Sequence, residues 1–163
     1  MKLPKLAALT LSLMLPSLVF AQGMQIGFGS LQQDSDQPVE ITADSLSLNQ
    51  TDGTALFQGN VLIIQGTMRM TAPEVLVFYN EDTSGISRLE TDGGRVLIVK
   101  DGDAAEADVA NYNIEDGIVV MTGDVLLTQG NNTLNSNRMT ADLNNGTAQM
   151  EGRVKTILKT EDE

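Results

Sequence analysis

Carboxylates are the side chains best able to do chemistry in this sequence, which contains 22 aspartates and glutamates but no cysteine and no histidine. Two close pairs occur, Asp101 with Asp103 and Glu115 with Asp116. Paired carboxylates can act as acid and base in glycoside hydrolysis, and they can also bind Ca²⁺. The missing residue types exclude thiol catalysis, histidine acid–base catalysis and zinc sites built on cysteine or histidine.

The segments that hold these carboxylates have the composition of turns. Gly102 lies between Asp101 and Asp103, and Gly117 follows Asp116. Acids clustered in turns are usually solvated, and no nucleophile or base accompanies them here. The EF-hand and glycine-rich nonapeptide calcium patterns are also missing. We therefore predict that the chain is not an enzyme and has no catalytic residues, metal site or cofactor.

The first 21 residues have the parts of a secretory signal peptide. Lys2 and Lys5 precede a mostly apolar run, and Val19-Phe20-Ala21 fits the pattern before a cleavage site. We expect cleavage after Ala21 and export to the periplasm. The predicted organisation is a signal peptide over residues 1–21, a flexible leader over 22–36, one folded domain over 37–160 and an acidic tail over 161–163.

The exported part of the chain is strongly acidic. Two of the ten basic residues precede residue 22 and no acidic residue does, which leaves eight basic and 22 acidic residues, a net charge of −14. A chain of this charge repels nucleic acid and anionic membrane surfaces, so we predict no nucleic-acid partner.

The predicted domain has the pattern of an all-β protein. Short apolar runs such as Val61-Leu62-Ile63-Ile64 and Val96-Leu97-Ile98-Val99 are bounded by turn formers such as Asp52-Gly53 and Asn145-Gly146. No stretch keeps helical periodicity for ten residues. At about eight residues per strand and turn, we expect roughly 15–16 short antiparallel strands in two facing sheets.

The strongest internal signal is a repeat in which a valine follows a glycine by two residues. A second short word, with alanine at its centre, precedes each glycine. The glycine spacings are 35, 29 and 29, which indicates stacked β modules with a bend at each glycine. The longer second unit predicts an insertion over about residues 80–93, in an exposed loop. The four glycines are Gly59, Gly94, Gly123 and Gly152, and the preceding words are Thr42-Ala43-Asp44, Thr71-Ala72-Pro73, Glu106-Ala107-Asp108 and Thr140-Ala141-Asp142.

A stack of strands leaves its first and last strands with unpaired backbone groups. One predicted edge is Val39, Glu40, Ile41 and Thr42, and the other is Val154, Lys155, Thr156, Ile157 and Leu158. In one interpretation, the lysines at the second edge only prevent unwanted pairing with other strands. Alternatively, the first strand of one copy pairs with the last strand of another, which gives head-to-tail self-association.

Several words of the sequence resemble the LptA family of periplasmic lipopolysaccharide-transport proteins, within the wider OstA-like group. The resemblance extends over about residues 35–158. It is carried by Asp36-Gln37-Pro38-Val39-Glu40-Ile41-Thr42-Ala43-Asp44, Phe57-Gln58-Gly59-Asn60-Val61, Gln65-Gly66, Ile118-Val119-Val120-Met121-Thr122-Gly123-Asp124-Val125 and Gln129-Gly130.

This resemblance implies an open, twisted β-jellyroll whose apolar groove binds the acyl chains of lipopolysaccharide. It also implies a bridge between the inner and outer membranes, with an LptC-like inner-membrane protein and the N-terminal domain of an LptD-like outer-membrane translocon as partners. The implied lipid-facing residues are Val39, Ile41, Val96, Tyr112 and Ile114. Because the chain is acidic, a phosphorylated lipid must be held by apolar contacts or by local basic residues such as Arg69, Arg95 and Arg138.

Two other readings of the pattern remain open at this point. The five lipid-facing candidates can equally be ordinary sandwich core, since most inward apolar residues only pack. The whole chain can be a periplasmic β-repeat filament or adhesin-like module that binds no lipid. Saturable uptake of a fatty-acyl probe separates a carrier from such a filament.

Overall fold

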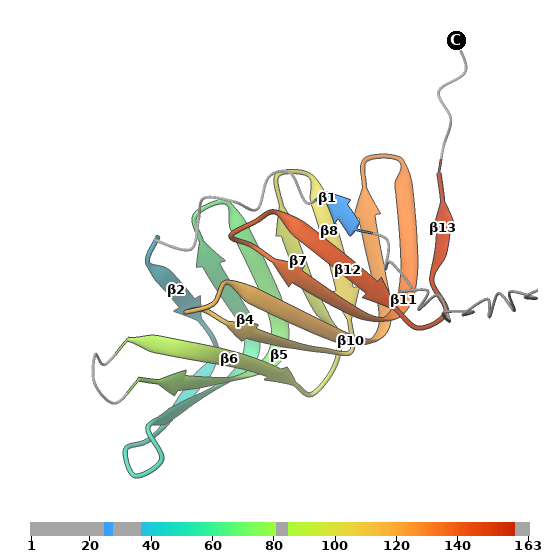
Figure 1. Ribbon diagram of the computed structural model, residues 1–163. Coiled ribbons are helices and arrows are strands. Elements are labelled where there is room, and N and C mark those ends of the chain that lie inside the picture. The colour runs from blue at the N-terminus through green and yellow to red at the C-terminus, as the bar shows by residue number, and fades with distance from the viewer. Residues whose placement is uncertain (1–24, 28–36, 81–84, 159–163) are drawn as a thin grey trace, which may run out of the picture.

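A computed structural model describes residues 25–27, 37–80 and 85–158, and within these residues every regular element is a β-strand. Figure 1 shows them as one curved antiparallel stack. The strands are β1 (Gln25–Gly27), β2 (Val39–Thr42), β3 (Ser45–Asn49), β4 (Thr54–Gln65), β5 (Met68–Tyr79), β6 (Ile86–Asp92), β7 (Val96–Lys100), β8 (Asp103–Ala107), β9 (Val109–Asn113), β10 (Ile118–Gln129), β11 (Asn132–Asp142), β12 (Thr147–Glu151) and β13 (Lys155–Ile157).

Four long strands, β4, β5, β10 and β11, bend in the middle and contribute one half to each of two facing sheets. The first sheet has the order β2, β4, β5, β7, β8, β10, β11, β13. The second has the order β3, β4, β5, β6, β9, β10, β11, β12, β1. This arrangement confirms the predicted all-β jellyroll. Within the part of the chain that the structure describes, the strands number thirteen instead of 15–16, because each bent strand continues through both sheets.

The bends lie at the repeated glycines, as the sequence predicts. The register of β4 shifts between Gln58 and Val61, and the register of β10 shifts between Thr122 and Val125. At the first of these bends Gly59 has φ +78°, a value that disfavours any residue with a Cβ atom. A Cβ atom on Gly59 would lie only 2.5 Å from a carboxylate oxygen of Asp44.

The two repeated words meet in space at each bend. The amide of Asp44 donates to the carbonyl of Gly59, and the amide of Asp108 donates to that of Gly123, both at 2.9 Å. In the second unit Pro73 lies against Gly94. In the fourth unit Asn137, and not Asp142 of the word Thr140-Ala141-Asp142, approaches the last glycine, Gly152.

Asp142 instead stabilises the turn between β11 and β12. Its carboxylate accepts hydrogen bonds from the amides of Asn144 and Asn145, at 3.0 and 2.9 Å, and from the side-chain amide of Asn145. The bonds from Asn145 are the main reason that the pKa of Asp142 is lowered.

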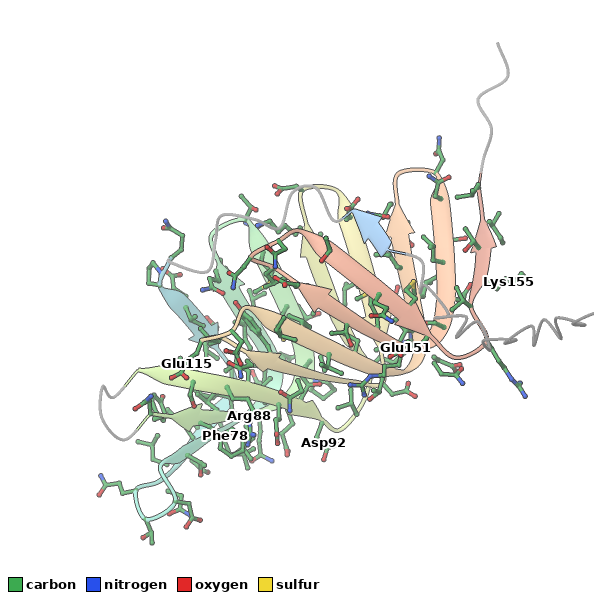
Figure 2. The ribbon with its side chains drawn as sticks, in the orientation of Figure 1. Phe78, Arg88, Asp92, Glu115, Glu151 and Lys155 are labelled. Atoms are coloured by element: carbon green, nitrogen blue, oxygen red, sulfur yellow. The ribbon has the colours of Figure 1, made fainter. Side chains whose placement is uncertain are left out.

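The expectation that residues 80–93 form an exposed loop is wrong for most of the segment. Residues 86–92 are strand β6, which pairs with both β5 and β9. Leu89 of this strand is buried, and the guanidinium of Arg88 stacks over the ring of Phe78 at 4.0 Å on the other face (Figure 2). The inserted residues therefore lengthen the second sheet, and the inward-facing Leu89 and Thr91, two residues apart, are both buried.

Part of the predicted leader is also ordered. Residues 25–27 form β1, which pairs antiparallel with β12 through Gln25↔Gln149, Ile26↔Ala148 and Gly27↔Thr147. The signal peptide, the rest of the leader and the acidic tail lie outside the described residues. Among the residues that are described, no helix could span a membrane.

Candidate functional site

The space between the two sheets is lined by aliphatic and methionine side chains. Tyr112 is the one aromatic residue among the buried apolar side chains that the structure describes. Alanines take up little volume, and methionine side chains are flexible enough to adapt to irregular neighbours. An interior of this composition can rearrange around a guest more readily than one built from aromatic rings. The buried methionines and alanines are Met68, Met70, Met121, Met139, Met150, Ala55, Ala72, Ala105, Ala107, Ala110, Ala141 and Ala148.

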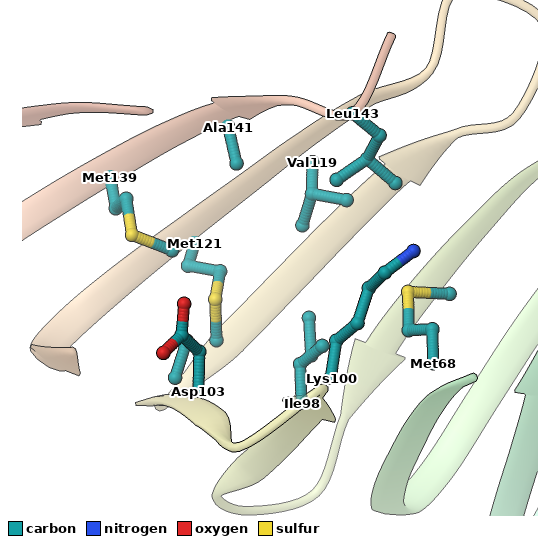
Figure 3. A pocket seen from close by; sticks show the side chains of 10 residues that line it. Met68, Ile98, Lys100, Asp103, Val119, Met121, Met139, Ala141 and Leu143 are labelled. Carbon is teal, nitrogen blue, oxygen red and sulfur yellow. The ribbon is translucent and has the colours of Figure 1, made fainter. Parts of the chain in front are cut away.

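A small apolar pocket of about 20 Å³ lies between the sheets (Figure 3). The first sheet contributes Met68, Ile98, Lys100, Asp103 and Ala105, and the second sheet side contributes Val119, Met121, Met139, Ala141 and Leu143. A space of this size holds about one water molecule. A hydrocarbon chain can therefore enter only if the two sheets move apart.

Four of the predicted lipid-facing residues lie on the inward side of their strands, and the fifth, Ile114, directly follows β9 and also packs inward. Val96 and Tyr112 are fully buried, with exposed fractions of 0% and 1%. Val39, Ile41 and Ile114 are partly buried and pack against the core. None of the five lines the pocket described above, which is formed by their neighbours.

A hydrogen bond links the two sheets beside this interior. The hydroxyl of Tyr112, on β9 of the second sheet, donates to Oε1 of Gln65, on β4 of the first sheet, at 2.9 Å. Both residues have an exposed fraction of 1%. The hydroxyl of Tyr112 is therefore buried and bonded between the two sheets.

Gln65 belongs to a row of inward-pointing polar residues along the hairpin ends of the first sheet, which lie along the top of Figure 1. The row is continued by direct cross-strand pairs, Lys100↔Asp103, Asp103↔Gln129 and Gln129↔Asn132. We call this row the polar rim; it consists of Gln65, Lys100, Asp103, Gln129 and Asn132.

Lys100 is the member of the rim that sequence reasoning missed. Its exposed fraction is 4%, and it is the one buried cation among the lysines and arginines that the structure describes. Val96, Ile98 and Lys100 are spaced two apart on one strand, so they share a face. This spacing, on a strand predicted to be buried, could have predicted that Lys100 points inward.

The arginines suggested from sequence point elsewhere. Arg69, Arg95 and Arg138 are all exposed. Arg95 lies 3.2 Å from Asp108, and Arg138 lies 3.6 Å from Glu151, whose outer position is visible in Figure 2. Their side chains cover the outside of the sheets and do not line the interior pocket.

The carboxylate pairs considered for chemistry are used in turns. Asp101 accepts from the hydroxyl of Thr67 at 3.2 Å, and Glu115 accepts from the side chain of Asn80 at 2.8 Å. Asp116 accepts from Asn113 at 2.6 Å. Within residues 25–27, 37–80 and 85–158, no group of three or more acidic residues is arranged to hold a metal ion.

The two ends of the stack carry exposed apolar side chains. At one end β2 and β3 each pair only with β4, and Leu46 and Leu48 of β3 are 51% and 66% exposed. At the other end β13 pairs only with β11, and Ile157 and Leu158 are 53% and 68% exposed. The edge of β12, in contrast, is covered by β1.

Comparison with known families gives a match to the family described as "LptA/(LptD N-terminal domain) LPS transport protein" over residues 40–150. The chain is 30% identical to an uncharacterized protein of Rhizobium meliloti over 156 residues, 89% of this chain and 83% of that protein. It is 27% identical to the lipopolysaccharide export system protein LptA of Escherichia coli K12 over 137 residues, 81% of this chain and 73% of that protein.

Comparison with solved structures gives the same architecture. The crystal structure of LptH from Pseudomonas aeruginosa, described as the LptA-homologous periplasmic component of the lipopolysaccharide transport device, superposes with a TM-score of 0.70 at 17% identity. The match covers 78% of this chain and 99% of that chain.

Proposed function

The chain belongs to the family of LptA and LptD N-terminal-domain lipopolysaccharide transport proteins, and on that basis we propose that it binds the acyl chains of lipid A between its two sheets in the periplasm. It is a transport component and not an enzyme. The observation that carries the finer proposal is the apolar pocket between the sheets.

Hydrophobic burial supplies enough free energy for such a role. Each methylene group removed from water contributes about 0.8 kcal/mol, so even one chain of ten methylenes gains roughly 8 kcal/mol before the cost of association. This gain can offset repulsion between an anionic lipid and an acidic protein, because exposed charges are screened by salt.

The open ends support a bridging role. In the proposed bridge, β2 of one copy continues the sheet that ends at β13 of the next, through backbone hydrogen bonds and the exposed apolar side chains at both ends. The same edges would receive an LptC-like inner-membrane protein at one end of the bridge and an LptD-like translocon domain at the other. A signal peptide over residues 1–21 would deliver the chain to the periplasm.

Two substitutions test lipid binding. Ile41→Asp and Ile114→Asp each place a charge on the inward face, and we expect each to weaken uptake of a fluorescent fatty-acyl probe at least about tenfold, because the charge must then be desolvated on binding. Thr42→Asp is the matched control, since Thr42 is the exposed neighbour of Ile41 on the same strand.

Far-UV dichroism establishes whether each variant keeps its β-sheet content. Unchanged uptake by a folded Ile41→Asp or Ile114→Asp variant would remove that residue from the proposed groove. If the unsubstituted protein takes up no probe, the filament reading replaces the carrier. In cells, a photo-crosslinker at position 41 or 114 should join the protein to lipopolysaccharide.

A further inference from the structure

The lip of the first sheet is polar, and the layer beneath it is apolar. Two residues further from the hairpins, an unbroken row of cross-strand pairs joins Ile63 to Met70, Ile98, Ala105, Leu127 and Leu134. All six are buried. Moving inward from the hairpin ends, the wall therefore changes from amide and charged groups to hydrocarbon within about 7 Å, the length of two residues in a strand.

The opposing lip, formed by the second sheet, has a different character. There Ile114, Val119 and Leu143 present aliphatic side chains, and Tyr112 directs its hydroxyl to Gln65. The two lips of the interior are thus unlike, with the polar groups concentrated on the first sheet.

Lys100 is the charged group best placed to meet a ligand in this space. In Figure 3 its side chain extends along the pocket toward Met68 and Leu143, and away from the carboxylate of Asp103. Asp103 accepts a hydrogen bond from Nε2 of Gln129 at 3.0 Å. A lysine ammonium is a compact charge with three donors, which suits a phosphate oxygen.

We propose that the polar rim binds the phosphorylated headgroup of the lipid, with the ammonium of Lys100 contacting a phosphate monoester. The inference rests on the proposed function, and it fixes an orientation. The headgroup lies at the hairpin ends of the first sheet, and the acyl chains run inward toward the glycine bends.

Charge and position favour Lys100 over the other cations. Arg69 is the neighbouring basic residue on β5, one position beyond Met68, but its side chain is exposed on the outer face of the same sheet. Asp103 would repel a phosphate, so the contact must form on the side of Lys100 that faces Met68 and Leu143. An ion contact in this partly desolvated place is stronger than one on the outer surface.

The test compares two lipids in three variants. Bisphosphorylated lipid A and its fully dephosphorylated form compete with a fluorescent fatty-acyl probe for the full exported chain. We expect the unsubstituted protein to prefer the phosphorylated lipid about tenfold, the size of one charge-assisted contact. Lys100→Met should reduce the preference below about twofold, while Lys100→Arg and the outward control Arg69→Met should retain most of it.

The outcomes separate this inference from the proposed function. If the dephosphorylated lipid and the probe bind but the protein has no preference for phosphate, the headgroup assignment is wrong and the acyl groove stands. The assignment is also wrong if Arg69→Met removes the preference, or if Lys100→Met keeps it. If no lipid competes at all, the carrier function and this inference fail together. Inorganic phosphate at millimolar concentration should not compete, because it lacks the acyl chains; competition would identify a free-phosphate site instead.

Discussion

At the scale of single residues, the bends depend on how closely a side chain approaches the backbone of the repeated glycines. The clearest case is Gly123, where φ is +81° and a Cβ atom would overlap the carboxylate of Asp108. Gly130 also has a positive φ, +55°, but a Cβ atom there would meet nothing within 4 Å. The two positions therefore separate the cost of the backbone conformation from the cost of the close approach.

We predict that Gly123→Ala lowers the free energy of unfolding by about 3 kcal/mol, and that Gly130→Ala lowers it by about 1 kcal/mol. The smaller value is that of a left-handed residue with a Cβ atom, and the larger one adds a steric clash that moves Asp108. Urea denaturation followed by far-UV dichroism measures both values. Equal losses at the two positions would show that the approach of Asp108 to the bend contributes nothing.

For single residues, the sequence predicted several inward-facing positions and missed others. Alternation was enough to place Val39, Ile41, Tyr112 and Ile114 on inward faces, because a strand has a fixed period of two. The same rule applied to Lys100, but a lysine is expected at the surface and was not considered for the interior. The contact of Asn137 with Gly152 could have been read from the repeat, because Asn137 precedes Gly152 by 15 residues, as Asp44 precedes Gly59 and Asp108 precedes Gly123. The likeness of Thr140-Ala141-Asp142 to the other words concealed this spacing.

At the scale of elements, short β-branched runs and glycine turns predicted the strands and the bends. They did not predict β6, because an insertion relative to the other repeats suggested a loop, whereas pairing with β5 and β9 decided its conformation. They did not predict β1 either. A three-residue strand has too little pattern to be recognised, and it forms because the edge of β12 offers unpaired backbone groups.

The exposed end strands lead to a prediction on assembly. Deleting residues 154–163 removes β13 and its apolar residues Val154, Ile157 and Leu158. We expect the dissociation constant for self-association to rise at least about tenfold. The reason is that β13, the strand proposed to pair with β2 of the next copy, is then missing. Light scattering across a concentration series measures this change.

Deletion of residues 159–163 alone is the control for the charge of the tail. That variant keeps β13 and should associate like the full exported chain. If both deletions leave the size distribution unchanged, head-to-tail pairing through this edge is excluded. The β12 edge cannot substitute for β13 without a further change, because β1 already pairs with it.

At the scale of the whole molecule, the proposed groove would provide a path for a lipid but no source of direction. Transfer of an acyl chain between two identical grooves changes its free energy very little, so net movement requires an input from elsewhere in the transport system. The sequence contains no glycine-rich nucleotide-binding motif that could supply it. What the fold can control is access, because the interior as it stands is nearly closed.

The pocket of about 20 Å³ is too small for even one acyl chain, so lipid binding requires the sheets to separate. The bends join the sheets along one side, and the bond between Tyr112 and Gln65 crosses the space between them.

Since the chain has no cysteine, Gln65→Cys with Tyr112→Cys gives one addressable pair for a crosslinker that contains a disulfide. We predict that the crosslinked protein loses most of its uptake of lipid A and of a single-chain fatty-acyl probe, because neither fits between sheets held at their present separation. Reductive cleavage should restore both. Each single-cysteine variant treated with the same reagent controls for modification alone. Equal uptake of lipid A by the crosslinked and cleaved forms would mean that the sheets need not separate, and that the lipid is held outside the space between them.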